Sequence, residues 1–429
     1  MKLLYPDGEI RHTSEDPVWQ KFTGAAGPLS GDCVENGIKR LKLMAQDPVS
    51  GPGHYLYLPR GAMVFNLLKA YLYDLYAEFG CFYLESPMLT DYEHDAVRNH
   101  AEQSGEKTYH THSSGRHLMT KIGALYSQLE LVSRNGIAPA VMPLKLFEMT
   151  KCCRIEDRIS PLRRACEFTM VDMHELCTDF DQACEESIAV HQRILELGRE
   201  FDMDFYCTYT VTDAFLKSHL PFLEQLVRIQ EKEALLIRAN PEKGRPLNLE
   251  YHVESGAGSP LEVSAFQIDC QNPEKFNIRN PDGSRPVLVH ANIVGSVERF
   301  MYALVARALD RNAFPLWLAP EQVRLVPPDA GNTGACLALA KRLGQEQIRV
   351  TVDDRADMTV TGKIQSAGDA MVPLVLTVDR ERLELVRAGN ASTPVSVEVL
   401  LDRIRSETVA KPVMKATFPL GLSEWPDYF

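Results

Sequence analysis

The chain has 429 residues, with 46 Lys and Arg against 58 Asp and Glu, which gives a formal net charge of −12. At about 150 residues per domain, this length predicts two or three domains. The content of 45% hydrophobic and 24% charged residues excludes disorder, collagen and coiled coil. No run approaches the roughly 18 consecutive apolar residues of a membrane helix, so a membrane span is not expected. The negative charge argues against long-range attraction to phosphate, but it leaves a local basic surface open.

The start of the chain and the cysteines predict a cytoplasmic protein. A proline and several charged residues interrupt the N-terminal segment MKLLYPDGEIRH before an apolar stretch of secretory length can form. The ten cysteines have irregular spacings and form no Cys-x-x-Cys pair. Such cysteines are typical of reduced thiols, because disulfides are rare in the cytosol.

The first predicted elements follow a segment rich in turn formers, DPVSGPG at residues 47–53. Apolar residues recur at spacings of three and four from Ala62 to Phe79, which predicts an amphipathic helix that ends at Gly80. The run Cys81 to Leu84 predicts a short strand. The polar stretch that begins at Ser86 is typical of a loop and a surface helix.

The central part predicts an antiparallel hairpin. Leu144 to Met149 and Glu167 to Met173 are strand-like, and the charged segment between them carries Pro161. Thr178, followed by Asp181, resembles a helix N-cap, and the helix is expected to end near Asp202.

A second helical stretch is predicted from about Thr212 to Arg238. Val287 to Val289 predicts a strand, and Gly295 begins a further helix. Strands and helices are mixed without β-α-β regularity up to residue 315, which favours an α+β domain with an antiparallel sheet.

The last part of the chain predicts a small α/β domain with parallel strands, because valine-rich runs alternate with helical stretches. The strands are expected at Val323 to Val326, Ile348 to Val352 and Leu374 to Val378, and the helices at about Cys336 to Leu343 and Thr361 to Ala370. We therefore expect an N-terminal extension at 1–50, a first folded domain at 51–318 and a second at 319–429.

Charged and aromatic residues on the predicted hairpin form the first candidate site. Arg154 and Glu156 alternate at the end of one strand, and Arg163, Arg164 and Phe168 return towards the other. Guanidinium groups bind phosphate through paired hydrogen bonds, a carboxylate can accept from an adenine amine, and a phenyl ring can stack on the base. This set could hold a nucleotide; on composition alone, a solvated charged hairpin is the alternative.

The second candidate is the segment PVLVHANIVGSVERF at residues 286–300. Gly295 and Ser296 allow a ligand to approach the start of the helix, and Arg299 could add a phosphate contact in its first turn. A glycine and an arginine at a helix start are by themselves a weak indication.

Taken together, these segments resemble the three motifs of class II aminoacyl-tRNA synthetases, and the chain is similar to the archaeal-type threonyl-tRNA synthetases. The matching segments include GHYLYLPRGAMVFNLL, ESPMLTDYEHDAVRNHAE, PLKLFEMTK, EFTMVDMHELCTDFDQACEE, HANIVGSVERF and TFPLGLSEWPDYF. The resemblance implies an antiparallel-sheet catalytic domain with flanking helices, followed by an anticodon-binding α/β domain. The N-terminal editing domain of full-length family members is not expected here.

The resemblance also implies an ATP site that forms an aminoacyl-adenylate with Mg²⁺. Arg154 matches the arginine that holds the α-phosphate and the amino-acid carboxylate, and Arg299 is the second catalytic arginine. The other ATP-binding positions are Glu156, Arg164, Phe168 and Ser296. The carboxylate attacks the α-phosphate in line, so positioned positive charge supplies most of the acceleration and no general base is needed.

For the amino acid, the resemblance implies that Asp172 takes the amino group and that Gln267 lines the same pocket. The family holds zinc through one cysteine and two histidines. His174 and His290 occupy the histidine positions, but Leu125 occupies the cysteine position. Leucine cannot ligate a metal, and structural or catalytic zinc sites normally use at least three protein ligands. Zinc is therefore left open.

Two other readings of these positions stay open as well. Cys177 or Cys166 could replace the missing ligand, or His174 and His290 could be core histidines with ordinary hydrogen bonds. Replacement of Leu125 by cysteine is expected to restore zinc binding if both histidines point into the pocket.

The acceptor of the activated amino acid is less clear from the sequence. Residues 320–429 contain 13 Lys and Arg and 15 Asp and Glu, a net charge of −2, whereas a tRNA-binding face concentrates positive charge. We expect an enzyme that activates threonine or a small analogue and passes it to tRNA, with a homodimer formed around Pro87. The alternatives are a paralogue that charges a carrier protein or an amine, and a catalytically silent tRNA-binding or regulatory relative.

Overall fold

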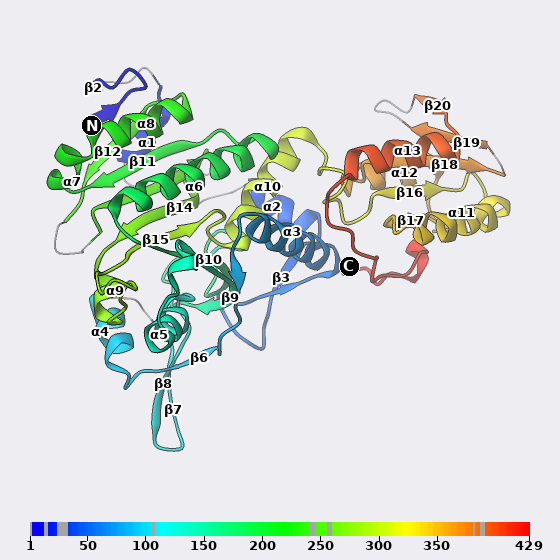
Figure 1. Cartoon of the computed structure of the whole chain (residues 1–429). Helices are drawn as coiled ribbons and strands as arrows, with labels where there is room; N and C mark the ends of the chain where they lie inside the picture. The colour runs from blue at the N-terminus through cyan, green and yellow to red at the C-terminus, as the bar shows by residue number, and fades with distance from the viewer. Residues whose placement is uncertain are drawn as a thin grey trace. The chain divides into compact units, whose positions relative to one another are not determined.

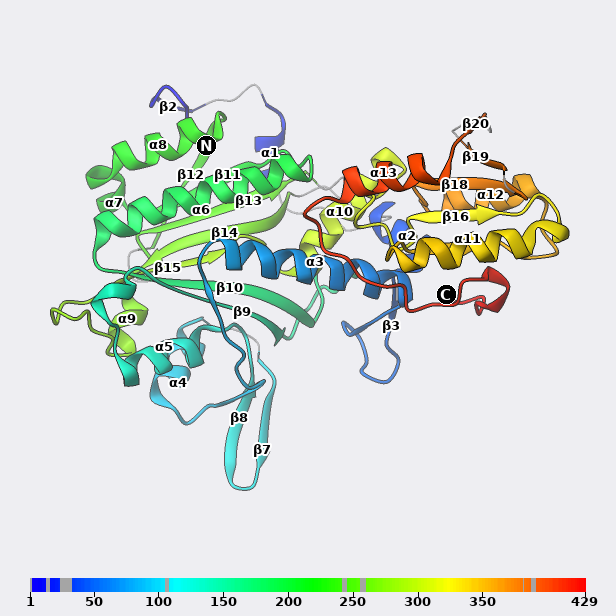
Figure 2. The same ribbon diagram turned by 45° about the vertical axis from the view of Figure 1, so that its right-hand side comes forward.

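A computed structural model describes residues 2–12, 16–23, 33–104, 108–240, 245–254, 260–380, 382–386 and 391–429. By mutual contacts the chain forms two compact units (Figures 1 and 2). Unit 1 comprises Met1–Asp32 and Leu75–Ala303, and unit 2 comprises Cys33–Asp74 and Leu304–Phe429. The helices α3 (Pro59–Glu78) and α10 (Val297–Arg311) each contribute residues to both units. The domain boundaries at 50 and 318 remain predictions.

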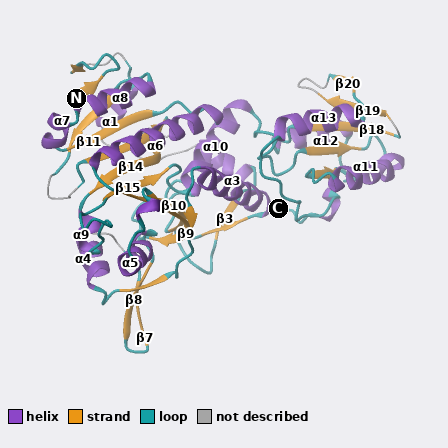
Figure 3. Cartoon of the chain, viewed as in Figure 1, coloured by secondary structure: helices purple, strands orange, loops and turns teal. Residues whose placement is uncertain are grey.

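Unit 1 is built on a ten-stranded sheet (Figure 3). The order across the sheet is β2 (Ile10–Arg11), β1 (Lys2–Leu4), β12 (Ala234–Arg238), β11 (Tyr206–Val211), β13 (Leu247–Val253), β14 (Leu261–Asp269), β15 (Val287–Asn292), β10 (Glu167–Cys177), β9 (Leu144–Cys153) and β5 (Phe82–Tyr83). Among the described strand pairs of this sheet, only β11 with β12 and β5 with β9 are parallel. The predicted antiparallel sheet is confirmed.

The hairpin of β9 and β10 is longer than predicted. Its register pairs Glu167 with Cys153 at one end and Leu176 with Leu144 at the other. Most of β10 is buried on both faces. The sequence therefore has no alternation of apolar and polar residues that would mark the end of the strand.

Helix α6 (Phe180–Glu200) packs against β10, β14 and β15 on one face of the sheet. Asp179 is its N-cap, because the Asp179 carboxylate accepts a hydrogen bond from the amide of Gln182 at 2.9 Å. The expectation that Thr178 caps this helix is wrong. The backbone amide of Thr178 instead donates a hydrogen bond to the side-chain oxygen of Gln182 at 2.8 Å. This contact joins the residue before the N-cap to the first turn of the helix.

The predicted helix from Thr212 to Arg238 is wrong in its last part. The segment forms α7 (Asp213–Ser218), then α8 (Leu220–Gln230), and then strand β12. Glu231 ends α8 in a left-handed conformation, with φ of 58°. The run ALLIR then pairs with β11 on one side and β1 on the other. A short apolar run is compatible with a helix or with a buried strand. Here the segment forms a strand because it pairs with a strand on each side.

The remaining elements of unit 1 lie around this sheet. A small sheet of β6 (Leu89–Asp91), β8 (Arg116–Thr120) and β7 (His110–Ser113) ends in a hairpin that projects away from the large sheet (Figures 1 and 2). The helices are α1 (Val18–Thr23), α4 (Asp95–Ser104), α5 (Leu125–Asn135) and α9 (Gln271–Lys275). Helix α5 contacts β10, and α9 contacts β15.

Unit 2 contains a five-stranded sheet in the order β17 (Val350–Val352), β16 (Val323–Val326), β18 (Leu374–Asp379), β19 (Arg382–Val386) and β20 (Ser392–Pro394). The first three strands are parallel, as predicted, and an antiparallel edge follows. Helices α11 (Thr333–Gln345) and α13 (Val397–Thr408) pack into one core, and α12 (Val360–Asp369) into a second core.

Unit 2 also includes α2 (Cys33–Arg40) and the strand pair β3 (Met44–Gln46) and β4 (Tyr55–Tyr57). Within the described ranges of the whole chain, no helix is both long and apolar enough to cross a membrane.

Candidate active site

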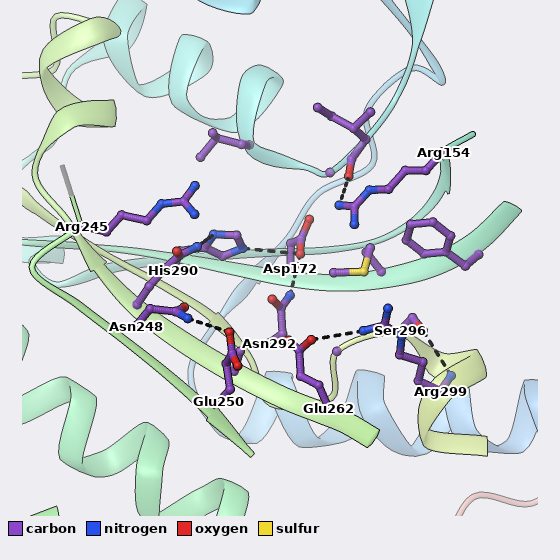
Figure 4. A pocket seen from close by; sticks show the side chains of 18 of the residues that line it. Arg154, Asp172, Arg245, Asn248, Glu250, Glu262, His290, Asn292, Ser296 and Arg299 are labelled. Atoms are coloured by element: carbon purple, nitrogen blue, oxygen red, sulfur yellow. Dashed lines mark hydrogen bonds and ion pairs between the residues drawn. The ribbon is translucent and has the colours of Figure 1, made fainter. Parts of the chain in front are cut away.

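A cavity of about 790 Å³ opens on the large sheet of unit 1 (Figure 4). Its walls come from β10, β13, β14 and β15, from the loop between β9 and β10, from the starts of α5 and α10, and from α9. The predicted site residues that line it are Leu125, Arg154, Glu156, Arg164, Phe168, Asp172, Gln267, His290, Ser296 and Arg299. His174 is not among the lining residues.

Strand geometry explains why these side chains meet. Successive side chains of a strand point to opposite faces, so residues two apart share a face. Phe168, Met170 and Asp172 follow this rule along β10, and His290 and Asn292 follow it along β15. Because β10 and β15 are neighbours, the two rows line one cavity.

Arg154 and Phe168 form one wall of the cavity. The guanidinium carbon of Arg154 lies 5.2 Å from the centroid of the Phe168 ring, and its Nη2 donates to the carbonyl of Ile122 at 3.2 Å. Nearby, Glu156 and Arg164 form an ion pair of 2.9 Å. A planar guanidinium beside an aromatic ring suits a phosphate and a base bound next to each other.

Arg299 is held at the start of α10. Its backbone amide donates to Oγ of Ser296 at 3.1 Å, and its Nη1 donates to Glu262 at 3.2 Å (Figure 4). The neighbouring Glu298 accepts the backbone amide of Thr169 at 2.8 Å, which ties the helix to β10. These contacts fix Arg299 at the edge of the cavity beside Ser296.

Asp172 is the buried carboxylate of the cavity. Its Oδ2 accepts the backbone amide of Ala124 at 2.8 Å, and its Oδ1 accepts the side-chain amide of Asn292 at 2.6 Å. Burial alone would raise the pKa of Asp172, but the contact with His290, the neighbouring His174 and the Ala124 amide outweigh it. The pKa of Asp172 therefore lies well below its ordinary value, so the carboxylate is ionised at neutral pH and can bind an ammonium group.

His174 and His290 lie side by side, with ring centroids 4.6 Å apart. His174 is fully buried, and its Nδ1 is 2.8 Å from the side-chain oxygen of Gln128 on α5. Burial and the neighbouring His290 lower the pKa of His174 to about 3, so this ring is neutral. His290 lines the cavity, and its Nδ1 accepts from the side chain of Gln267 at 2.7 Å.

The side chains present do not fit a zinc ion. Leu125 offers no donor atom, and the alternative third ligands, Cys166 and Cys177, do not line the cavity. Within the described ranges, no three His, Cys, Asp or Glu side chains are arranged to hold a metal. Two imidazoles are fewer than the three protein ligands that zinc normally takes.

Several lining residues were missed by the sequence reasoning. Asn292 stands two residues after His290 on β15, which extends beyond the predicted strand Val287 to Val289. A longer predicted strand would have placed Asn292 on the face of His290. Arg245 and Lys275 lie outside every motif, and Glu262 lies well before Gln267 on β14. No local signal marks these three, because contacts between distant segments bring them to the cavity. The pairing of β13 with β14 places Arg245 and Glu262, and the contact of α9 with β15 places Lys275.

Two family profiles match the chain. The one described as tRNA synthetase class II core domain (G, H, P, S and T) matches residues 126–308, and the one described as anticodon binding domain matches residues 322–410. With the antiparallel sheet and the cavity on it, these matches define a class II aminoacyl-tRNA synthetase core followed by an anticodon-binding domain.

Comparison with curated relatives identifies the family within this class. The threonine–tRNA ligase of Methanothrix thermoacetophila is 30% identical over 417 residues, which cover 91% of this chain and 67% of that protein. The threonine–tRNA ligase of Methanopyrus kandleri is 28% identical over 472 residues, covering 99% of this chain and 75% of that protein. The chain belongs to the threonyl-tRNA synthetase family.

A solved structure shows the same fold. The RNA binding domain of threonyl-tRNA synthetase from Cryptosporidium parvum Iowa II aligns with a TM-score of 0.77 and 18% identity. The alignment covers 88% of this chain and 98% of that chain.

Proposed function

We propose that this chain is an ATP-dependent ligase that activates a small amino acid, threonine or an analogue, and transfers it to tRNA. The observation that carries the proposal is the cavity itself. Arg154, Phe168 and Arg299 form a wall suited to a nucleotide, and the ionised Asp172 lies in the same cavity. One site can thus hold ATP and the ammonium group of an amino acid together.

In the first step, Asp172 binds the substrate ammonium and directs its carboxylate towards the α-phosphate. A carboxylate oxygen attacks the α-phosphorus, a new acyl–phosphate bond forms, and the bond to pyrophosphate breaks. Arg154 neutralises the charge that develops on the α-phosphate. Mg²⁺ enters with ATP as part of the substrate and screens the phosphates. The attacking carboxylate is already ionised, so no side chain has to remove a proton.

In the second step, a hydroxyl of the acceptor attacks the acyl carbon and AMP leaves. The match to an anticodon binding domain supports tRNA as the acceptor. The exposed arginines of unit 2 include three that pair with glutamates, namely Arg342 with Glu398, Arg403 with Glu407 and Arg405 with Glu346. Such pairs reduce the charge available to phosphates, so a carrier protein is the second acceptor to test.

We also propose a homodimer through the region of Pro87. Phe82, Met88 and Leu89 in this region are 59%, 39% and 47% exposed. Phe82 lies on β5, the edge strand of the large sheet. Exposed apolar side chains at a sheet edge favour association with another chain. Light scattering of the purified protein tests this proposal: a dimer is expected, and a Leu89→Asp variant should shift it towards a monomer.

The test of the activity is amino-acid-dependent exchange between ATP and radioactive pyrophosphate, measured across the twenty amino acids and close analogues. We expect exchange with at least one small amino acid, followed by transfer of the labelled amino acid to tRNA but not to a carrier protein. ATP binding without exchange would refute the proposal and favour a catalytically silent relative.

A further inference from the structure

Three basic side chains line the cavity and have no place in the ATP-binding set, namely Arg163, Arg245 and Lys275. Arg163 belongs to the same hairpin loop as Arg164, so the two that lie away from the hairpin are Arg245 and Lys275. Arg245 lies just before β13, and Lys275 is the last residue of α9. Burial lowers the pKa of Lys275, Asp269 opposes this shift, and the charge of Arg245 adds to it. The two cations are therefore close enough to act on each other.

Arg245 lies on the side of His290 away from Arg154. Figure 4 shows Arg245 and Arg154 on opposite sides of the cavity, with His290 and Asp172 between them. An amino acid whose ammonium group binds Asp172 and whose carboxylate faces Arg154 would direct its side chain past His290. Arg245 is therefore placed at the side-chain end of the amino acid, and not at the nucleotide.

The carboxylates of the cavity contact other groups, and none of them forms an ion pair with Arg245 in the described part of the chain. Glu156 pairs with Arg164, Glu262 pairs with Arg299, and Glu250 accepts from Asn248 and His252. Asp269 accepts the backbone amides of Gln271 and Asn272 at 2.8 and 2.9 Å. Within the described residues, Arg245 has neither an ion pair nor a hydrogen bond. A half-buried guanidinium without a counter-ion is a strong site for an anion.

The cavity also lacks a metal site that could bind a neutral hydroxyl group of the substrate side chain. Leu125 presents only carbon atoms to the cavity, and no third ligand joins His174 and His290. Recognition of the side chain must therefore come from the polar and charged groups that remain near His290. Gln267 is already bonded to His290, and other neutral polar side chains such as Asn240 and Gln271 line the same cavity. Arg245 is the cation that Figure 4 shows beside His290.

We propose that the amino acid activated by this chain carries an anionic group on a short side chain, a carboxylate or a phosphate, which Arg245 and Lys275 bind. The inference rests on the proposed function, because it names the substrate class of the same cavity. It assigns Arg245 the role of a specificity-determining residue.

The experiment compares each anionic amino acid with its neutral counterpart in pyrophosphate exchange. Aspartate is compared with asparagine, and O-phosphothreonine with threonine, so the two pairs distinguish a carboxylate from a phosphate. We expect kcat/KM for one anionic member to exceed that of its neutral counterpart by about 10-fold or more, since hydrogen bonds to charged groups are the strong ones.

Variants locate this preference at Arg245. Arg245→Gln should lower kcat/KM for the anionic amino acid by about 10- to 100-fold and leave the KM for ATP unchanged. Arg245→Lys should restore part of the loss, because it restores the charge without the planar fork. Arg228→Gln, an exposed change on α8, is the matched control and should have no effect.

The possible failures are distinct. Exchange that is best with threonine or another neutral amino acid, and that is unaffected by Arg245→Gln, would overturn this inference and leave the proposed function intact. A loss confined to the transfer to tRNA would also overturn it, because Arg245 would then serve the acceptor. Exchange with no amino acid at all would overturn the proposed function, and this inference with it.

Discussion

Asn292 donates a hydrogen bond of 2.6 Å from its side-chain amide to Oδ1 of Asp172, between the neighbouring strands β15 and β10 (Figure 4). The same amide also donates to the carbonyl of Val171 at 3.0 Å, so its position is fixed from two directions. The backbone amide of Ala124 holds the other oxygen of Asp172. The carboxylate proposed to bind the substrate ammonium is thus oriented before the substrate arrives.

Removal of this contact should weaken binding of the amino acid and not of ATP. We expect Asn292→Ala to raise the KM for the amino acid by about 10-fold, because a hydrogen bond to a charged group contributes about 1.5–3 kcal/mol. The KM for ATP should change less than about twofold, a difference within the spread of surface substitutions. Pyrophosphate exchange with each substrate varied in turn measures both constants. Equal rises in the two constants would show that Asn292 supports the whole cavity and not Asp172.

Arg154 should not tolerate even a conservative change. Arg154→Lys keeps the positive charge but loses the planar fork that can bind a phosphate and a carboxylate at once. We expect kcat/KM for ATP to fall by about 10²- to 10³-fold, the range found when a group that stabilises a transition state is removed. Exchange rates at saturating amino acid measure the loss. Arg134→Lys, on the exposed face of α5, is the control and should retain full activity. Wild-type rates for Arg154→Lys would rule out a role at the α-phosphate.

Substitution of Leu125 should create a metal site. Nδ1 of His174 donates to Gln128, which leaves the Nε2 lone pair of His174 open to a metal. Nε2 of His290 lies 3.5 Å from Asp172, and a metal bound there would displace its proton. Leu125→Cys would add a thiolate as the third ligand that zinc requires. We expect the wild-type protein to hold no zinc, and the variant to hold about one zinc per chain. Metal analysis after dialysis provides the measurement. If the metal content of the variant equals that of the wild type, position 125 does not face the two histidines.

Glu321 should make the stability of unit 2 depend on acid pH. Burial opposes its ionisation, but the charges of Arg324 and Arg60 and a hydrogen bond from Thr351 outweigh burial and lower the pKa of Glu321 to about 2. A lowered folded-state pKa means that the stabilisation is complete above the ordinary pKa of a glutamate, about 4.3. It is then lost as the pH falls towards 2. We therefore expect the wild type to lose stability over this window.

The variant Glu321→Gln tests whether the ionisation of Glu321 causes this pH dependence of stability. At pH 7 it leaves two buried cations without their counter-ion, a change that costs about 3–5 kcal/mol. The difference from the wild type should shrink below about pH 4, because the wild-type glutamate then becomes neutral as well. Urea unfolding at several pH values measures the difference in the free energy of unfolding between the wild type and the variant. Glu398→Gln, in an exposed ion pair, should change stability by no more than about 1 kcal/mol. A difference that stays constant with pH would contradict the assignment.

The resemblance of the motifs to a known family predicted many of the residues that line the cavity, and local strand geometry accounts for their position. Phe168 and Asp172, and His290 on the next strand, could be placed on common faces because the alternation of side chains is a local property of the chain. The hairpin of β9 and β10 and the helix of Ser296 and Arg299 were predicted for the same reason, since their signals lie within about twenty residues. What the sequence could determine by itself was therefore the fold class and the residues Arg154, Phe168 and Arg299 that line one part of the cavity.

Other features depended on contacts between distant segments. Ala234–Arg238 became a strand because β1 and β11 flank it. His174 has the strand position of a cavity residue, yet Gln128 on α5 binds it and keeps it buried. Arg245 joins the cavity only through the pairing of β13 with β14. Hydrophobic periodicity carries no information about which distant segments will meet, so only the tertiary structure decided the donor set around His290 and the place of Arg245 in the cavity.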